Sequence, residues 1–586
     1  MLSTKRILDT NKSTDASVAR LAARCAAPCS HRRAESASKK SDSMISIMLT
    51  MMPLAVQRVV VVGSGWGGLS AAHTLSQQSD VQVTVVSADK RPGGLVSDSF
   101  LTPGGRRAEA GQHGFWDEYG NIFGLIDSLN LPEDPLTGYA EQGQYSPKGK
   151  EAIWPVYRDS SINLPKGLAQ SLRLGAQGLP TGLAQAILTR FENISPLELA
   201  TAAPLVLAFS EFDDSPEAWE KYDKISFRDL CVKLGVSRRL YKAAFEPMIL
   251  TGLFAPGEEC SAAAALGMAY FFVLKHQNSF DVRWCKGNVG ELIFAPWVEQ
   301  MEARGVKFLQ ETRAVDFTCD EASGELRSVL CQEMPTGDKF SLDECDQVVF
   351  AVGGAALSGL VRSSPALAQH AEWRRFANLR GLGVLATRLF LDVHVPTEYT
   401  ANACWGFDDG VGMTFFDIKR LHAPRLDFEP GSVLEVDFYH SNSLLVMSDE
   451  AIIQRAKAHL DTILGDACKR ASVVDAAIVR LPNAVNWYAP GSYNNMPDLK
   501  SSSIKNAYFV GDLVRTRHGS WSQEKAFVTG KQAANVMLGR DENEGVVPLK
   551  ADEVHVDAGR KAVGLARTVL GGGDAKRGPS LVDFLW

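Results

Sequence analysis

A glycine-rich turn is the part of this sequence best suited to bind a nucleotide. It follows the apolar run 59–62 and contains Gly63, Gly65, Gly67 and Gly68. The first, second and fourth of these glycines have the spacing of a turn that binds the pyrophosphate of a dinucleotide. The following helix would offer free N–H groups and a partial positive charge to the phosphates. Without a ligand, the same pattern would be a tight turn from strand to helix.

The residues after the second expected strand, 81–86, depart from the usual dinucleotide pattern. That pattern requires a carboxylate about 20 residues after the glycines, where it binds the ribose hydroxyls. Ser87 ends this strand, and Asp89 follows two residues later. Ser87 can bond to a hydroxyl more weakly than a carboxylate can. Asp89 can replace it if the turn is reshaped; otherwise Asp89 is an ordinary loop carboxylate.

A second glycine pair follows a cation in the segment Arg91-Pro92-Gly93-Gly94. Two N–H groups with little steric cover, beside an arginine, suit a second contact with a pyrophosphate or a flavin. Without a ligand, the segment would be a plain Pro-Gly turn.

The elements that must position these residues begin with strand, helix and strand within 58–86. Strand-like runs return at 306–309 and 347–352, and a last one at 507–510 ends in Gly511-Asp512. Apolar residues at helical spacing predominate from 121 to 278, whereas strong alternation within 381–438 predicts an antiparallel sheet. We therefore predict an α/β fold with a Rossmann-like domain that is split in the sequence. A substrate domain of antiparallel sheet plus helices would complete it.

Several motifs resemble those of FAD-binding flavoproteins of the amine oxidase and carotenoid (phytoene) desaturase-like superfamily. They are GSGWGGLSAA at 63–72, RPGG at 91–94, YFVGD at 508–512, EAGQHGFW at 109–116 and WCKGNVGE at 284–291. The resemblance covers about 58–538 and implies a bound FAD. A nicotinamide dehydrogenase would usually keep its nucleotide site in one contiguous domain. Here the glycine-rich turn and the strand that ends in Gly511-Asp512 are far apart in the sequence, which also favours FAD over NAD.

The resemblance implies roles for further residues. In these families the backbone of a short strand after a helical insert contacts adenine, which implies this role for Val315. The Asp that closes the last strand binds the ribityl and phosphate region, which implies that role for Asp512 beside Gly511. The implied domain boundaries are a disordered, transit-peptide-like 1–57, FAD-binding parts at 58–120, 301–360 and 496–540, a helical substrate domain at 121–300, a substrate-domain sheet at 361–495 and a C-terminal tail at 541–586.

A helix is expected after Asp512, and its N-terminal end lies near Gln523. Its partial positive charge would face the flavin N1–O2 edge and make hydride acceptance at N5 easier. The superfamily often has Glu-Gly-Ala where this chain has Glu524-Lys525-Ala526. The added bulk and charge put close packing against the flavin in doubt. We interpret Lys525 as an outward, solvated side chain.

The catalytic residues are not evident from the sequence. His113 and His518 are candidates for acid–base work beside the flavin, although His113 is better explained as a hydrogen-bonded core histidine. Arg515 and Arg517 would contact a phosphate or an electron acceptor, or else form a salt-bridged loop. An apolar cavity could be lined by Trp116, Phe271, Phe272 and Trp521.

The resemblance implies an FAD-dependent oxidoreductase that takes hydride from a hydrophobic polyene, as carotenoid desaturase- or isomerase-like enzymes do. A quinone or oxygen would be the electron acceptor. A second candidate is an amine oxidase, which needs an aromatic cage and usually a carboxylate for the cation. A third is a protoporphyrinogen oxidase-like enzyme. A fourth is a non-catalytic flavoprotein-fold binding protein, which the unusual Ser87 and Lys525 would favour.

Composition excludes several functional classes. The net charge of -7 argues against a nucleic-acid binder, because phosphates require a basic face. No apolar run reaches the roughly 18 residues of a transmembrane helix. The runs 199–209 and 262–274 would be buried helices or a peripheral membrane contact. No cysteine or histidine spacing predicts a metal site, and we expect the cysteines to be reduced and mostly buried.

The segment 1–57 is rich in arginine and serine and poor in acidic residues. This is the composition of organelle transit peptides. It predicts import into a plastid (chloroplast), with a mitochondrion or the cytoplasm as alternatives.

Overall fold

Five parallel strands form the sheet that carries the glycine-rich turn, in the order β10-β2-β1-β14-β20. Their bounds are Lys307–Leu309 (β10), Val81–Val86 (β2), Gln57–Val62 (β1), Gln347–Phe350 (β14) and Ala507–Phe509 (β20). Parallel registers join Val60 to Thr84 of β2 and to Val348 of β14. Since these strands come from distant parts of the chain, the predicted α/β fold with a split Rossmann-like sheet is confirmed.

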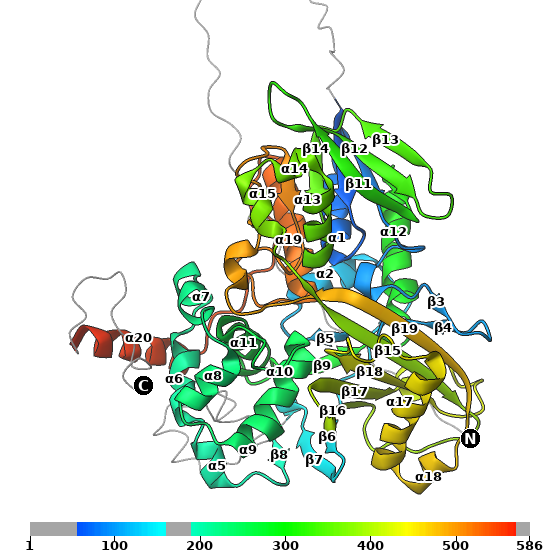
Figure 1. The fold of residues 1–586 in the computed structure, drawn as a ribbon, viewed down its shortest axis with the longest axis vertical. Coiled ribbons are helices and arrows are strands. Elements are labelled where there is room, and N and C mark those ends of the chain that lie inside the picture. The colour runs from blue at the N-terminus through cyan, green and yellow to red at the C-terminus, as the bar shows by residue number, and fades with distance from the viewer. Residues whose placement is uncertain (1–55, 160–188, 570–586) are drawn as a thin grey trace, which may run out of the picture. The chain divides into compact units, whose positions relative to one another are not determined.

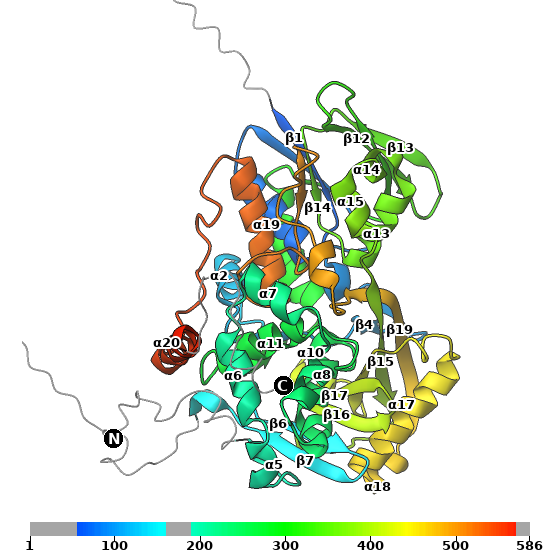
Figure 2. The ribbon, with the colours of Figure 1, turned by 60° about the vertical axis from the view of Figure 1, so that its left-hand side comes forward.

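The computed structural model describes residues 56–159 and 189–569 (Figure 1). The predicted transit-like segment 1–57 therefore lies almost entirely outside the described residues. The described residues belong to one compact unit. Within it, the parallel sheet lies at one end and a large mixed sheet at the other (Figures 1 and 2).

Strands β1 and β2 consist largely of valine, and most of these valines are buried. Such strands suit the interior of a parallel sheet, where both faces are covered. Helices α1 (Trp66–Leu75) and α19 (Gln523–Met537) pack closely together beside the sheet. A Cβ atom on Gly530 of α19 would lie 2.2 Å from the Gly67 carbonyl oxygen. Small residues are thus required where the two helices cross. Helices α2 (Gly120–Ser128) and α12 (Ala295–Glu302) lie nearby; α12 continues from the π-helix η5 (Gly290–Phe294).

A three-stranded antiparallel sheet follows β10 in the chain. Its strands are β11 (Thr312–Cys319), β12 (Leu326–Glu333) and β13 (Lys339–Asp343). The β11–β12 register shifts between Ala314 and Asp316, so Val315 lies at an irregularity. The helices after β14 are α13 (Gly354–Ser363), α14 (Pro365–Ala368) and α15 (Ala371–Phe376).

The large sheet has the order β19-β15-β18-β17-β16-β6-β7-β8. Its strands are β19 (Val473–Asn486), β15 (Gly381–Leu391), β18 (Val433–Tyr439), β17 (Val411–Asp417), β16 (Ala401–Asp408), β6 (Gln142–Ser146), β7 (Gly149–Trp154) and β8 (Arg190–Phe191). The predicted antiparallel sheet within 381–438 is confirmed. The hairpin β6–β7 was not expected within a helical 121–300; it joins the sheet through a parallel pairing with β16.

Helices form the rest of the end of the molecule that holds the large sheet. They are α5 (Pro196–Ala200), α6 (Ala203–Glu211), α7 (Pro216–Tyr222), α8 (Phe227–Lys233), α9 (Arg238–Leu240), α10 (Glu246–Leu253), α11 (Ala262–Ala269), and the π-helices η3 (Tyr241–Phe245) and η4 (Tyr270–Leu274). Helix α5 begins after Ser195, which forms a capping box with Glu198. Every residue of α11 is buried, so this part of the apolar run 262–274 is a core helix.

Short elements and peripheral helices complete the described chain. They are η1 (Gly94–Val96), β3 (Phe100–Leu101), β4 (Arg107–Ala108), β5 (Gly114–Trp116), η2 (Tyr157–Asp159), β9 (Val282–Trp284), α16 (Ile418–Leu421), α17 (Asp449–Leu464), α18 (Asp466–Lys469), η6 (Ser492–Asn495) and α20 (Val554–Val569). Helix α17 packs Ile452, Ala456 and Leu460 into a core with the large sheet. The cysteines of the described residues are free thiols, all buried except the half-buried Cys319.

Candidate functional site

The glycine-rich turn has the geometry that the sequence predicts. Gly63 has a φ of 110°, and a Cβ atom there would lie 2.2 Å from the Ala351 carbonyl oxygen. A Cβ on Gly68 would lie 2.0 Å from the Gly63 oxygen, so only glycine lets α1 approach β1 this closely. By contrast, a Cβ on Gly65 would meet no atom within 4 Å. Gly63 and Gly68 are therefore needed for close packing, whereas Gly65 leaves space beside the backbone.

The second and third glycine-bearing segments converge on this turn. The Gly93 N–H donates to the Ser64 carbonyl oxygen at 2.9 Å. A Cβ on Gly67 would lie 3.1 Å from the backbone nitrogen of Gly511, and Gly511 itself borders open space at a φ of 128°. Residues near the start and near the end of the described chain therefore meet at one place.

This place fits the pyrophosphate of FAD. Gly65 is the N-cap of α1, which has no side-chain cap and no acidic residue in its first turn. The helix N-terminus thus keeps its N–H groups and partial positive charge for an anion. The room beside Gly65 is where the phosphates of a dinucleotide approach the backbone.

Two of the predicted contact residues also have structural roles. Ser87 is buried, and its Oγ accepts a hydrogen bond from Ser64 Oγ at 2.7 Å. Arg91 forms an ion pair at 3.0 Å with the buried Asp98. Asp89, in contrast, is exposed beyond the end of β2. Both Ser87 and Arg91 help to hold the glycine-bearing loops in place.

Asp512 follows β20 and is bound by two residues at and just after the end of the long strand β19. Its Oδ1 accepts from Asn486 Nδ2 at 2.9 Å, and its Oδ2 accepts from the Tyr488 hydroxyl at 3.3 Å. Burial raises the pKa of Asp512 above its ordinary value. The sequence did not point to Asn486 or Tyr488, since neither belongs to a spacing motif.

The N-terminal end of α19 connects this region to the segment 109–116. Gln523 donates from Nε2 to the Gly114 carbonyl oxygen at 3.0 Å and accepts from Trp66 Nε1 at 2.8 Å. Glu524 accepts hydrogen bonds from the backbone N–H groups of Asn121 and Ile122, at the start of α2. The helix therefore begins at 523 as expected, held by side chains from its own first turn.

The interpretation of Lys525 as a solvated side chain is wrong. Lys525 is 7% exposed, and burial lowers its pKa, against the opposing charges of Asp214 and Asp512. It lines a second cavity of about 300 Å³ together with Arg515 and Arg517. The first turn of α19 is enclosed by neighbouring segments, so the usual rule that lysine faces water fails here.

The two arginines of this second cavity form ion pairs. Arg515 bonds to both carboxylate oxygens of Asp498, at 2.6 and 2.9 Å. Arg517 lies 3.8 Å from Asp213. The interpretation as a salt-bridged loop therefore describes Arg515 well.

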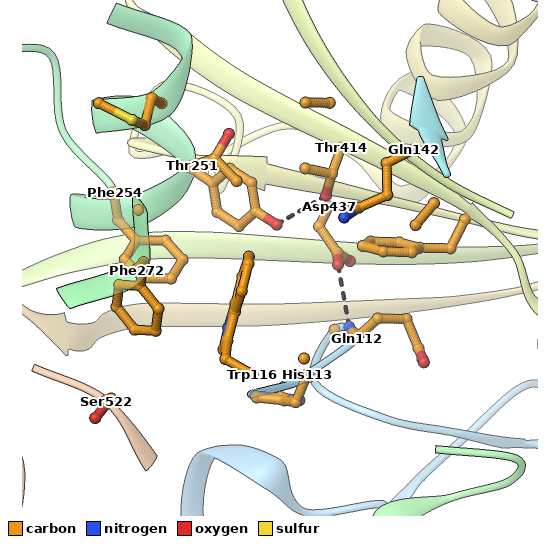
Figure 3. A pocket seen from close by; sticks show the side chains of 18 of the residues that line it. Gln112, His113, Trp116, Gln142, Thr251, Phe254, Phe272, Thr414, Asp437 and Ser522 are labelled. Carbon is orange, nitrogen blue, oxygen red and sulfur yellow. Dashed lines mark hydrogen bonds between the residues drawn. The ribbon is translucent and has the colours of Figure 1, made fainter. Parts of the chain in front are cut away.

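A mostly apolar cavity of about 280 Å³ lies beside the segment 112–114 (Figure 3). Trp116, Phe272 and Trp521 line it, as predicted. Phe271 does not; it packs against Gly519, where a Cβ would lie 2.5 Å from the Phe271 ring. Further walls come from helices α10 and α11, from η3, and from strands β6, β7, β9, β15, β16, β17, β18 and β19. The cavity thus joins the N-terminal end of α19 to the large sheet.

The two histidine candidates differ in position. His113 lines the apolar cavity, so it is not an ordinary core histidine, and burial lowers its pKa to about 4. His518 is also buried, and burial together with the charges of Lys275 and Lys525 lowers its pKa to about 4. It lines neither the apolar cavity nor the second cavity beside Lys525. Both rings are neutral at pH 7.

A buried group of charged residues lies behind the cavity, and no sequence motif pointed to it. Arg388 of β15 donates to Glu435 of β18 and lies 3.5 Å from Glu109. Asp437, two residues beyond Glu435, lines the cavity and accepts from the Gln112 backbone N–H at 3.1 Å. All residues of β18 are buried. Its alternating carboxylates were the available signal, but alternation alone suggests a solvent-facing side.

Among residues 56–159 and 189–569, no helix combines the length and the apolar character needed to cross a bilayer. Nor do these residues bring together a group of side chains that could hold a metal ion.

Comparison with known proteins identifies a family, similar sequences and similar folds. Residues 66–538 match a family model described as flavin containing amine oxidoreductase. The probable zeta-carotene desaturase of Synechococcus elongatus is 23% identical over 499 residues, covering 82% of this chain and 98% of that protein. The chloroplastic/chromoplastic 15-cis-phytoene desaturase of Solanum lycopersicum is 24% identical over 504 residues, covering 83% and 78%. Cyclohexylamine oxidase from Brevibacterium oxydans has a similar fold, with a TM-score of 0.57 and 16% identity over 83% of this chain and 100% of that chain.

Proposed function

Because this chain belongs to the family of flavin containing amine oxidoreductases, we propose that it oxidises a long, hydrophobic polyene. Family membership makes it an FAD-dependent oxidoreductase, as its motifs predicted. Bound FAD supplies the hydride acceptor. The protein must then hold the cofactor, orient the substrate and exclude water.

The apolar cavity is the observation that carries the substrate assignment. Its residues 112–114 and 521–523 lie at the N-terminal end of α19. Its far walls are mostly apolar side chains of the helices and the large sheet, with a few polar groups such as Asp437 and Asn402. A volume of about 280 Å³ is at the small end for ligand sites. It would therefore hold the reacting segment of a polyene. The similar proteins of Synechococcus elongatus and Solanum lycopersicum are a zeta-carotene and a 15-cis-phytoene desaturase, which supports this class of substrate.

The cofactor would be held mainly by backbone groups. The proposed FAD-binding residues are Gly63, Gly65, Gly67, Gly68, Ser87, Asp89, Arg91, Gly93, Gly94, Val315, Gly511 and Asp512. The open space at Gly65 and the uncapped start of α1 support the pyrophosphate position. His113 is the better of the two histidine candidates for a role near the substrate, because it lines the cavity.

An amine oxidase activity is less well supported by the charges in the cavity. Binding of an ammonium group favours an ionised carboxylate. Asp437 is the carboxyl in the cavity wall, and burial together with the charge of Glu435 raises its pKa well above the ordinary value. A carboxyl whose ionised form is disfavoured by burial is a poor ion-pair partner for a cation.

Anaerobic mixing of the FAD-loaded protein with candidate substrates tests the proposal. We expect carotenes to remove the yellow absorbance of the oxidised flavin, and putrescine and protoporphyrinogen to leave it unchanged. Reduction by putrescine without reduction by any polyene would contradict the proposal and favour an amine oxidase.

We also propose a plastid location and a peripheral membrane contact. The arginine- and serine-rich segment 1–57 and the chloroplastic relatives of Solanum lycopersicum and Arabidopsis thaliana support the location. Leu197 of α5 and Val206 of α6 expose apolar side chains that would suit a membrane surface, from which a polyene must come. The proposed electron acceptor is a quinone or oxygen.

A further inference from the structure

The most informative residue outside the cofactor region is Asp437, in the wall of the apolar cavity. It is only 2% exposed. Its Oδ2 accepts the Gln112 backbone N–H at 3.1 Å, which holds the carboxyl in place (Figure 3). Its Oδ1 is buried and has no hydrogen-bond partner among the described residues. One oxygen of a buried carboxyl in the cavity wall is thus left without a protein partner among these residues.

The charged residues behind Asp437 do not neutralise it by direct contact. Arg388 is engaged by Glu435 and by Glu109, and Gln112 Nε2 bridges these same two carboxylates at 3.2 and 3.3 Å. One guanidinium is therefore paired with two buried carboxylates, and Asp437 is a third buried carboxyl nearby, without an ion pair of its own in the described part of the chain. Burial and the charge of Glu435 raise the pKa of Asp437 well above its ordinary value. A neutral carboxyl both donates and accepts a hydrogen bond.

The neighbouring polar groups in the cavity do not hydrogen-bond to Asp437 Oδ1. Thr414 Oγ1 and the Tyr439 hydroxyl bond to each other at 2.8 Å rather than to Asp437. Asn402 donates to the Tyr399 carbonyl oxygen, while its own buried Oδ1 also has no partner among the described residues. The residues of the cavity wall therefore carry four buried polar atoms without a partner among the described residues, at His113, Asn402, Asp437 and Trp521, and only Asp437 is a carboxyl.

A pure hydrocarbon would leave the Asp437 oxygen unpaired in a dry site, which is costly for a buried polar atom. A ligand oxygen at this position would remove that cost. Sites built to hydrogen-bond a ligand oxygen discriminate strongly against analogues that lack it.

We propose that the cavity prefers an oxygen-bearing polyene, an alcohol or a ketone, whose oxygen hydrogen-bonds to the Asp437 carboxyl. This inference rests on the proposed function, because it assumes that the cavity holds the polyene. It makes Asp437 a specificity-determining residue, and it places the substrate oxygen on the side of the cavity formed by β18 and Gln112.

Equilibrium binding to the FAD-loaded protein tests the inference. The probes are β-carotene and echinenone, which differ by one ketone oxygen, dispersed in the same detergent and followed by the change in flavin fluorescence. We expect the unchanged protein to bind echinenone about tenfold or more tightly than β-carotene. Asp437→Leu should bind the two within about twofold of each other, without weaker binding of β-carotene.

Two further variants separate recognition from folding. Asp437→Asn keeps a donor and an acceptor and should retain most of the preference. Asp417→Asn alters a buried carboxyl of the same sheet that does not line the cavity and should leave the preference unchanged. If Asp437→Leu fails to fold, as judged by circular dichroism and FAD content, the binding of the two probes by the unchanged protein still decides, because equal affinities would overturn the inference.

The outcomes distinguish this inference from the function on which it rests. Equal binding of the two probes by the unchanged protein, or an undiminished preference in a folded Asp437→Leu, would overturn the inference alone. Failure of both polyenes to bind or to reduce the flavin would overturn the proposed function as well.

Discussion

The glycine-rich turn and the apolar cavity are built in opposite ways. At the turn, backbone meets backbone, and a single added Cβ at Gly68 would lie 2.0 Å from another residue's oxygen. In the cavity, side chains from many separate elements form the walls. A site made of backbone contacts restricts the residue type at each position, whereas a site made of side chains restricts only the total shape and polarity. The first kind leaves a recognisable spacing in the sequence, and the second does not.

The strongest test of this contrast replaces two glycines of the same turn. Gly68→Val places its Cβ against the Gly63 carbonyl oxygen, and relief requires a backbone shift between β1 and α1. We expect the variant to lose several kcal/mol of folding free energy, at the upper end of single substitutions. Low soluble yield and a lost cooperative transition in circular dichroism would be the readout. A melting temperature equal to that of the unchanged protein would contradict the packing role.

Gly65→Val is the matched substitution, because its Cβ meets no atom within 4 Å. We expect it to fold normally but to lose FAD, since the side chain occupies the space that a pyrophosphate needs. The ratio of flavin to protein absorbance after purification measures this. Normal flavin content would mean that the cofactor lies elsewhere.

A smaller effect is expected from narrowing the cavity. Ala244 of η3 lines it, and Ala244→Phe adds a ring to a space of about 280 Å³. Polyene binding to the FAD-loaded protein should weaken about tenfold while flavin content stays unchanged. Val232→Phe, on the exposed face of α8, is the control for added bulk. Equal polyene affinity in both variants would indicate that the substrate does not enter this cavity.

The last predicted effect is a pH dependence of stability in the part of the molecule that carries the glycine-rich turn. His73 Nδ1 accepts the Trp297 indole N–H at 2.8 Å, and burial, with the charges of Arg304 and Lys531, lowers the pKa of His73 from 6.5 to about 4. The neutral ring therefore stabilises the fold above pH 6.5, and this contribution is lost as pH falls from 6.5 to 4. The difference is at most about 3 kcal/mol.

His73→Asn keeps an acceptor near the Nδ1 position but does not titrate. Chemical denaturation at pH 7 and at pH 4.5 should therefore show a smaller loss of stability in this variant than in the unchanged protein. Equal losses would mean that different buried histidines, such as His422, account for the acid sensitivity.

The sequence predicted the fold better than the substrate cavity. Gly63 and Gly68 could be assigned because backbone geometry admits no other residue there, and the valines of β1 indicated a strand covered on both faces. Lys525 was misjudged, because residue type suggests exposure and only the enclosure of the first turn of α19 overrides it. Asp437 could not be found, because its importance depends on Gln112, Glu435 and Arg388, which lie on different segments.

The meeting of Gly67 with Gly511 has a consequence for the order of events during synthesis. The first strand and the turn leave the ribosome long before β20 and α19 exist. Until these late elements arrive, one edge of β14 and one side of α1 stay uncovered, and such non-local closure is slow. The proposed flavin site is therefore complete only in a nearly finished polypeptide, and a chain that stops upstream of α19 would lack one side of it.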